Sequence, residues 1–338
     1  MSSLGEEVTT NNLIYRGSVK DIYTCKNNNN VVFSFSDRYS IFDWGEMPDL
    51  IEDKGKALSY MGAFFFDFLG NSENWINWSE AKDLSNDQKE LLKLFRESGV
   101  NHHYVKMSDE IKYGLEVKKV DVPNVSAPES YNYEYYKSRV TNALVPLEVI
   151  FRFGVPVGSS LVNRRDDVKV GDTFSKPLIE FSSKLEAVDR YMSFDEAKSI
   201  AGLSQIEMNR LLDSTALIAA RLKDFFSKHG IELWDGKFEF AFGDNRELVL
   251  VDSIGPDELR LICDGESLSK EYLRQFYSDS SWKKALKKSQ NEKCNNIQDY
   301  VINVLKESPR NLENEYKALN RKLEDINQQK IEEQKKET

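Results

Sequence analysis

Short runs of β-branched and aromatic residues predict strands in the N-terminal part of the chain. Val31–Phe35 (VVFSF) is such a run, and the polar, turn-prone stretch Asn27–Asn30 precedes it. Residues around Ile22–Tyr23 and Val31–Phe35 are therefore predicted to pair as a β-hairpin. A sheet is thus expected near the start of the fold.

A second predicted strand, Leu147–Phe153 (LEVIFRF), carries charge on one side only. Side chains of a strand point alternately to its two faces, so Glu148, Ile150 and Arg152 share one face. Two interpretations of this face are open. Glu148 and Arg152 form a mutual ion pair on a solvated surface, or they belong to the polar wall of an active site.

Hydrophobic positions that recur at helical spacing predict two longer helices. One stripe covers residues 57–69, is rich in Phe and is expected to end at Gly70. Ser193–Glu196 and Ser204–Glu207 each fit the capping-box pattern of a helix start. The stripe after the second box predicts a long amphipathic helix ending at Gly230. The Phe-rich stripe is interpreted as core.

A β-hairpin is predicted where phenylalanines at 238, 240 and 242 alternate with smaller or polar residues. Glu239 falls on the opposite face, residues 243–245 form the turn, and Leu248–Val251 returns to Asp252. The turn brings Glu239 and Asp252 into one neighbourhood, and paired carboxylates hold Mg²⁺ beside nucleotide phosphates. The plainer interpretation is a solvent-facing Glu and an Asp that ends a strand.

Two loops have the composition of ligand-binding loops. Residues 252–257 (DSIGPD) turn away from the hairpin, and Arg260 follows shortly after. Acidic residues, a turn and a basic residue thus lie close together in the sequence, as is common in binding loops. Near the N-terminus, Gly17 lies between extended segments with Lys20 shortly after it. Glycine lets backbone N–H groups approach phosphates and lysine adds charge, although the pattern is not a Walker A loop.

Composition narrows the class of protein. The chain has 338 residues, 40% hydrophobic and 30% charged, which is typical of a folded protein. Its net charge of −10 argues against nucleic-acid binding, and no apolar run is long enough to span a membrane. Three scattered cysteines and an N-terminus without signal-peptide character favour the cytoplasm. The three histidines have no zinc-site spacing.

The order of these features suggests three parts of the chain. Residues 1–110 are expected to form an N-terminal sheet lobe and residues 111–282 a C-terminal lobe, and the family resemblance given below implies that the first is nucleotide-binding and the second catalytic. Residues 283–338 are rich in Lys, Glu, Gln and Asn and read as a charged helical extension. We expect a compact two-lobed unit with an extension that is dispensable or serves for docking.

Several segments together resemble one enzyme family. Phe35–Asp43 (FSDRYSIFD) resembles the DRISAFD signature of SAICAR synthetase, phosphoribosylaminoimidazole-succinocarboxamide synthase. Further segments follow in the order of that family from about residue 13 to 280: Gly17–Tyr23 (GSVKDIY), Asp53–Leu69, Asn101–Val105 (NHHYV), Pro146–Phe153, Ser182–Glu186 (SSKLE), Lys237–Asp244 (KFEFAFGD), Leu248–Arg260 and Ser267–Tyr277. Each is short, but their collinearity makes chance similarity improbable.

The resemblance implies an α+β fold with an antiparallel N-terminal sheet lobe, a mixed α/β C-terminal lobe and ATP in the cleft between them. It implies an ATP-dependent ligase that joins the carboxylate of carboxyaminoimidazole ribotide (CAIR) to the amine of L-aspartate in purine biosynthesis. ATP and Mg²⁺ are the implied cofactors, and an acyl phosphate is the implied intermediate. The implied partners are these small molecules, with a homo-oligomer left open.

The resemblance also implies roles for individual residues. Nucleotide-binding residues are Gly17, Ser18, Lys20, Glu239 and Asp252, with Glu239 and Asp252 as the metal ligands; Lys20, Lys184 and Asp257 are the catalytic candidates. The implied substrate-binding residues are Ser40, Asp43, Glu148, Arg152, Ser159, Ser160, Lys184, Asp257, Arg260, Lys270 and Arg274.

Several positions depart from the family pattern. Ser18 stands where Lys usually follows the glycine, Ser253 where Glu follows Asp, and Gly255 where Thr precedes Pro-Asp. The loop after Arg152 is about one residue longer, which leaves Ser159 and Ser160 as alternatives. These departures keep two other readings open: a paralogous amide ligase acting on another carboxylate and amine, and a nucleotide-binding protein without turnover.

Overall fold

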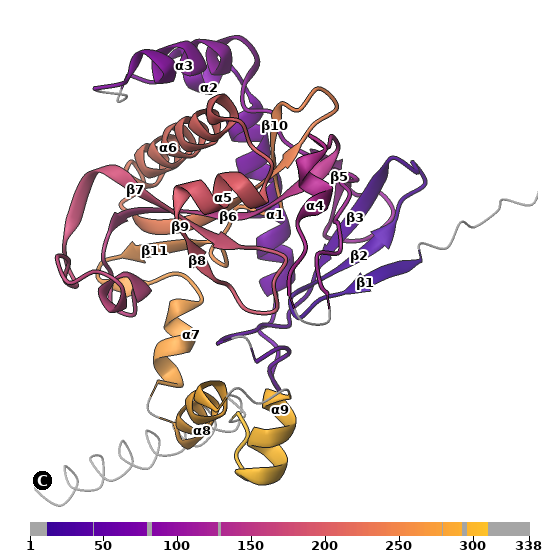
Figure 1. The fold of residues 1–338 in the computed structure, drawn as a ribbon, viewed down its shortest axis with the longest axis vertical. Helices are drawn as coiled ribbons and strands as arrows, with labels where there is room; N and C mark the ends of the chain where they lie inside the picture. Colours follow the sequence, from indigo (N-terminus) through magenta and orange to yellow (C-terminus); the bar gives the residue numbers. More distant parts are fainter. Residues whose placement is uncertain are drawn as a thin grey trace, which may run out of the picture.

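The fold contains two antiparallel sheets with helices packed on and between them (Figure 1). It was obtained as a computed structural model, and the structure describes residues 12–42, 44–79, 83–127, 130–278, 280–292 and 296–309. Asp43 and the tail from residue 310 therefore lie outside the described residues, as does Cys294.

The N-terminal sheet has five strands in the order β1-β2-β3-β5-β4. The predicted hairpin is confirmed, since β2 and β3 pair antiparallel with Ile22 opposite Phe33. Helix α1 packs against β3, β4 and β5. The strands are β1 (Leu13–Arg16), β2 (Lys20–Thr24), β3 (Asn30–Phe35), β4 (Tyr104–Met107) and β5 (Gly114–Lys118).

The second sheet is larger and has the order β12-β11-β9-β6-β7-β8, with β10 paired to the far end of β9. The hairpin predicted from alternating phenylalanines is confirmed as β9 and β10. The strands are β6 (Ala143–Gly154), β7 (Thr173–Ser183), β8 (Tyr191–Met192), β9 (Glu232–Phe242), β10 (Leu248–Val251), β11 (Leu259–Cys263) and β12 (Glu266–Ser267).

The two predicted long helices are present. Helix α1 (Lys54–Gly70) ends at the expected glycine, and α6 (Gln205–Ser227) begins with the complete capping box of Ser204 and Glu207. The other helices are α2 (Glu73–Ile76), α3 (Asn86–Ser98), α4 (Glu134–Lys137), α5 (Phe194–Ile200), α7 (Glu271–Phe276), α8 (Ser281–Asn291) and α9 (Ile297–Asp299), with a 3₁₀ turn at Ser160–Asn163 and a π-helical turn at Tyr300–Val304.

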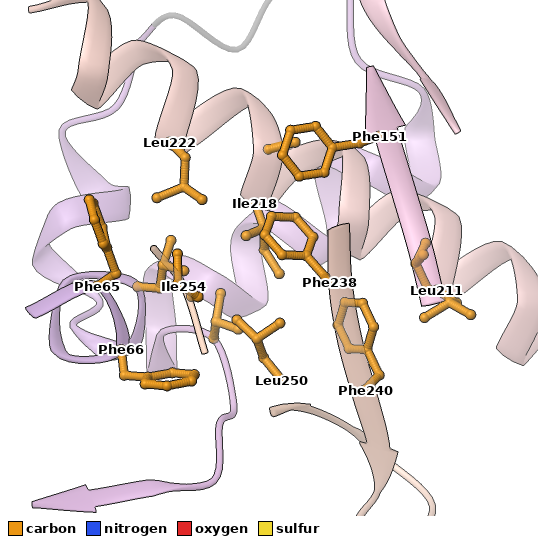
Figure 2. Close-up of a cluster of buried hydrophobic side chains, with 14 of the residues drawn as sticks. Phe65, Phe66, Phe151, Leu211, Ile218, Leu222, Phe238, Phe240, Leu250 and Ile254 are labelled. Atoms are coloured by element: carbon orange, nitrogen blue, oxygen red, sulfur yellow. The ribbon is translucent and has the colours of Figure 1, made fainter. Parts of the chain in front are cut away.

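One hydrophobic core joins the two sheets. Phe65 and Phe66 of α1 lie near Ile218 and Leu222 of α6, and Phe238 and Phe240 project from β9 into the same cluster (Figure 2). Residues 238 and 240 are buried, as their alternation predicts, and the Phe-rich stripe of α1 is core. The shared core fixes one sheet against the other, which gives the α+β, two-lobed architecture expected from the sequence.

A second, smaller core lies beside the main body. Four residues of the N-terminal loop pack there against the C-terminal helices: Tyr39, Ile41, Trp44 and Met47. Trp282 lies edge-on to Trp44 at a ring-centroid distance of 5.4 Å. Gln298 donates a hydrogen bond to the backbone oxygen of Trp44. In Figure 1, α8 and α9 lie together at the lower end of the molecule, reached by this N-terminal loop. The proposed division at residue 282 falls within α8, so residues beyond it support the signature segment.

The other proposed division, at residue 110, falls between β4 and β5, two strands that pair in one sheet. Within the part of the chain that the structure describes, no helix is both long and apolar enough to cross a membrane.

Candidate active site

One face of the second sheet is apolar and the other is densely charged. The apolar face carries the phenylalanines of β9, so Lys237 and Glu239, which alternate with Phe238, point the other way. Strand register places Glu148 of β6 opposite Glu239, and Arg152 opposite Asp235. The charged residues of neighbouring strands therefore form continuous rows across this polar face.

A lysine–carboxylate network occupies one row. Lys237 Nζ lies 2.5 Å from Glu148 Oε1 and 3.1 Å from Glu239 Oε1, and Lys184 Nζ lies 2.7 Å from Glu239 Oε1. Ser182 donates a hydrogen bond of 3.1 Å to Glu148 Oε2. Two ammonium groups thus neutralise two buried carboxylates.

The network shifts the pKa of each member. Burial lowers the pKa of Lys237 and of Lys184, but the facing carboxylates outweigh burial and raise both pKa values, that of Lys237 strongly. Burial raises the pKa of Glu148, but the two lysines outweigh it and lower this pKa. The pKa of Glu239 stays raised, first through burial and then through repulsion from Asp252.

In the next row, two carboxylates hold Arg152 in place. Arg152 Nε donates to Glu180 Oε2 at 2.7 Å, and Nη1 donates to Asp235 Oδ2 at 2.8 Å. Arg260 Nη1 donates to the same Asp235 oxygen at 3.2 Å. Glu148 and Arg152 therefore form no ion pair with each other, and the solvated-surface interpretation is wrong. Both belong to a polar wall.

The two candidate serines after Arg152 have different environments. Ser159 is buried, and its Oγ accepts from Arg152 Nη1 at 3.4 Å. Ser160 lines the cavity described below, and its Oγ lies 3.1 Å from Tyr191 OH and 2.9 Å from Arg164 Nη1. A ligand in the cavity can reach Ser160, whereas Ser159 supports Arg152.

Asp252 ends β10 and forms an ion pair with Lys20 from β2 of the other sheet. Its backbone has a positive φ of 67°, a conformation that Asp tolerates better than most residues. Burial raises the pKa of Asp252, but the charges of Lys20, Lys184 and Lys237 outweigh burial and lower it. His103 Nε2 lies 3.2 Å from the Asp252 carbonyl oxygen, and burial lowers the pKa of this histidine to about 3.

The glycine loop leads into Lys20. Gly17 donates its N–H to the Lys20 carbonyl at 3.0 Å, and a Cβ at position 17 would lie 2.5 Å from that oxygen. Arg38 Nη2 donates to the Gly17 carbonyl at 3.1 Å. Glycine is therefore required for this tight turn, and Ser18 is left on the cavity side of it.

A cavity of about 690 Å³ lies against the polar face. The sequence-predicted residues that line it are Ser18, Ser40, Glu148, Arg152, Ser160, Lys184, Asp257, Arg260, Lys270 and Arg274. Glu239 adjoins it through its contact with Lys184, whereas Lys20 and Asp252 pair with each other outside the lining. Asp43 lies outside the described residues, next to Phe42, which lines the cavity.

Sequence reasoning missed several residues of this wall. Asp235 and Lys237 line the cavity. The two-residue alternation that placed Glu239 on the polar face of β9 also places these two residues there. Lys54, at the start of α1, forms an ion pair of 2.9 Å with Asp257. Glu258 also lines the cavity, but nothing in its local sequence distinguishes it from an exposed strand residue.

The donor set suits a nucleotide-bound magnesium ion better than a fully protein-bound metal. Among the described residues, no group of three or more His, Cys, Asp or Glu side chains is arranged to hold a metal. Glu239 and Asp252 provide two neighbouring carboxylates, and Ser253 adds no third. Mg²⁺ is commonly held by one or two carboxylates together with substrate phosphates, which this pair fits.

The fold and the cavity define an α+β protein whose two sheets meet beside a cavity lined by cationic and carboxylate side chains. A family model described as SAICAR synthetase matches residues 13–289. The chain belongs to the SAICAR synthetase family. A relative from Archaeoglobus fulgidus, assigned by name to the phosphoribosylaminoimidazole-succinocarboxamide synthases, is 36% identical over 291 residues, covering 79% of this chain and 80% of that protein. A synthase of that name from Thermoplasma acidophilum is 29% identical, covering 80% and 84%.

Solved structures share the fold. A SAICAR synthetase in complex with ADP gives a TM-score of 0.56 at 22% identity, covering 88% of this chain and 99% of that one. SAICAR synthase from Saccharomyces cerevisiae in complex with SAICAR gives a TM-score of 0.54 at 21% identity, covering 81% and 86%. These neighbours have the same two-lobed architecture as this chain.

Proposed function

We propose that this protein joins the carboxylate of CAIR to the amine of L-aspartate, with cleavage of ATP to ADP and phosphate. The observation that carries the proposal is the polar sheet face, where Lys184, Lys237, Arg152 and Arg260 line one cavity in a member of the SAICAR synthetase family. ATP, the ribotide and aspartate are all anionic, so a site that gathers them needs this concentration of cations.

The reaction requires that a carboxylate become an electrophile. Its oxygen attacks the γ-phosphorus of ATP, the bond to ADP breaks, and the acyl phosphate forms. Lys184 and Lys237 stay protonated, because the facing carboxylates raise their pKa values. We assign them to stabilise the negative charge that develops on the transferring phosphoryl group.

The nucleotide is assigned to the side of Lys20. The tight turn at Gly17 leads directly into Lys20, which provides a cation for the phosphates. Glu239 and Asp252 would hold Mg²⁺, which would supply positive charge near the nucleotide phosphates. Lys20 contacts Asp252, and we propose that the nucleotide phosphates compete with this carboxylate for the Lys20 ammonium group.

The ribotide phosphate is assigned to the Arg152 end of the cavity. Ser160 and Arg260 line this end together with Arg152, whose position is fixed by Glu180 and Asp235. We propose Ser160 rather than Ser159 as the hydroxyl that contacts the phosphate, because Ser160 faces the cavity. Hydroxyl and guanidinium donors at one point are typical of phosphate recognition.

The imidazole and aspartate are assigned to the remaining wall. Ser40 and Asp257 line it, Asp43 follows shortly after Ser40 in the sequence, and Lys270 and Arg274 provide charge for the aspartate carboxylates. Asp257 is held by Lys54, which fixes its direction. We further propose that the enzyme works in the cytoplasm, where three scattered cysteines stay reduced.

Release of ADP tests the proposal. The purified protein with ATP and Mg²⁺ is expected to release ADP only when the ribotide and aspartate are both present. Omission of either substrate provides the control. Turnover with a different acid or amine would support a paralogous ligase, and ATP binding without turnover for any pair would overturn the ligase assignment.

A further inference from the structure

Glu258 occupies an unusual position in the cavity. It stands one residue before β11, at the end of the turn that begins at Asp252, and its side chain lines the cavity. Its backbone is fixed at both ends, with its N–H donated to Gly255 O at 3.1 Å and its carbonyl accepting from Lys237 N at 3.1 Å. The carboxyl group is therefore held at one place on the wall.

One oxygen of the Glu258 carboxyl group has an unusual environment. Its Oε2 is buried, and within the described part of the chain this oxygen accepts no hydrogen bond. The other carboxyl groups on the wall are engaged, for example Glu148 by Lys237, Asp235 by Arg152 and Asp257 by Lys54. An unsatisfied buried carboxyl group is costly for a protein unless a ligand uses it.

A glycine and a lysine lie close to Glu258. Position 255 is glycine, and a Cβ there would lie 3.7 Å from Glu258 Oε2. Lys270 lines the same cavity, and its ammonium group makes no ion pair among the described residues. A carboxyl oxygen and an ammonium group on one wall, neither of them paired within the described residues, match the amine and the carboxylate of an amino acid.

The charges around Glu258 tune its proton affinity. Burial raises its pKa, the charges of Asp252 and Asp257 raise it further, and Lys20 and Lys270 lower it, which leaves the pKa at about 7. A proton acceptor works best when its pKa lies near the working pH. Burial and the charge of Arg274 lower the pKa of Lys270.

We propose that Glu258 accepts the proton that the amine of aspartate must lose before it attacks the acyl phosphate. This inference rests on the proposed function. The aspartate ammonium transfers H⁺ to the Glu258 carboxylate, and its nitrogen lone pair then forms the C–N bond. The C–O bond to phosphate breaks, inorganic phosphate leaves with the electron pair, and the second N–H proton and the Glu258 proton pass to phosphate and solvent.

The substitution Glu258→Gln keeps the shape of the side chain and removes the acceptor. Aspartate-dependent turnover is expected to fall by about 100-fold or more, with the KM for ATP changed by less than about threefold. Hydroxylamine, which is largely unprotonated at neutral pH, needs no acceptor. Its trapping of the acyl phosphate as a hydroxamate should therefore proceed in the variant at a rate near that of the wild type.

The pH dependence supplies a second readout. The residual aspartate rate of Glu258→Gln is expected to rise about tenfold per pH unit, because the variant waits for amine that is already deprotonated in solution. Glu258→Asp, which keeps a carboxyl group, should recover part of the rate. Loss of hydroxylamine trapping together with a residual rate independent of pH would assign Glu258 a structural role and overturn the inference.

The two proposals fail in different ways. If the wild type forms no ADP with the ribotide and either nucleophile, the proposed function itself is wrong. If the wild type turns over and Glu258→Gln keeps aspartate turnover within about threefold, only the role of Glu258 is wrong.

Discussion

Replacing Lys237 by Met tests the physical basis of the polar sheet face. The Lys237 ammonium lies 2.5 Å from Glu148 and 3.1 Å from Glu239, so the substitution removes one charge from two buried carboxylates. Met is unbranched and of similar length, which keeps the loss of packing small. The change in stability therefore reports mainly the electrostatic contribution of the ammonium group.

The expected size follows from the geometry. Removing one partner of a buried ion pair costs about 3–5 kcal/mol, because the remaining charge is uncompensated. The Lys237 side chain keeps 26% exposure, and Lys184 still lies 2.7 Å from Glu239, so we expect about 3 kcal/mol. Lys228, paired with Asp224 at 2.8 Å and 62% exposed, provides the matched control, and Lys228→Met should cost less than about 1 kcal/mol.

The loss should also depend on pH. Without Lys237, burial raises the pKa values of Glu148 and Glu239 in the folded variant. A group whose folded pKa exceeds its unfolded pKa stabilises the fold at low pH, and this stabilisation is lost as the pH rises through the folded pKa. The difference from the wild type is therefore expected to shrink between about pH 7 and pH 5.

Urea unfolding at both pH values measures the effect. The wild type, Lys237→Met, Lys228→Met and the double variant Lys237→Met/Glu148→Gln form the set, and the double variant should be more stable than Lys237→Met alone, because one uncompensated charge is gone. A loss in Lys237→Met that equals the control and is the same at both pH values would refute the electrostatic reasoning.

Three further predictions address other parts of the molecule. Trp282→Ala should lower the free energy of unfolding by about 3 kcal/mol. It should also raise the KM for the ribotide, because Trp282 packs in the smaller core against Tyr39 and Ile41, the neighbours of Ser40. An unchanged KM would contradict this prediction. Gly17→Ala should weaken ATP binding about tenfold or more in calorimetry, since the added Cβ would lie 2.5 Å from the Lys20 carbonyl oxygen. Gly255→Ala is the control and should bind ATP normally, because no atom lies closer than 3.5 Å to the added Cβ. Burial raises the pKa of Glu207, but its contacts with Arg246 and Ser204 outweigh burial and lower the pKa to about 2. Glu207→Gln should therefore lower the free energy of unfolding by about 2 kcal/mol at pH 7. Because the folded pKa lies below the usual 4.5, urea unfolding should show this difference vanish as the pH falls from 4.5 toward 2.

Helices and strands with a clear local hydrophobic periodicity could be predicted from the sequence. Helix α1 and the β9–β10 hairpin follow from spacings of three to four and of two residues, and the capping box at Ser204 marks the start of α6. The polar face around Glu239 followed from the same alternation. These features depend on neighbours within a few residues, so the chain itself displays them.

Features that depend on strand order could not be predicted in this way. Asp235 belongs to the site because β6 lies beside β9 in a register that sets it opposite Arg152, 83 residues away. The burial of Glu258 depends on the turn from Asp252, and the support of Trp44 by Trp282 joins distant parts of the chain. Each of these contacts is settled by tertiary packing and not by local pattern.

Transfer of oxygen from the ribotide carboxylate tests the central claim most directly. The ribotide labelled with ¹⁸O in that carboxylate is incubated with ATP, Mg²⁺ and aspartate, and the released phosphate is analysed by mass spectrometry. An acyl phosphate intermediate requires that one labelled oxygen leave with phosphorus while the other stays in the amide carbonyl. We predict one ¹⁸O atom in each phosphate released, and unlabelled phosphate would contradict the account.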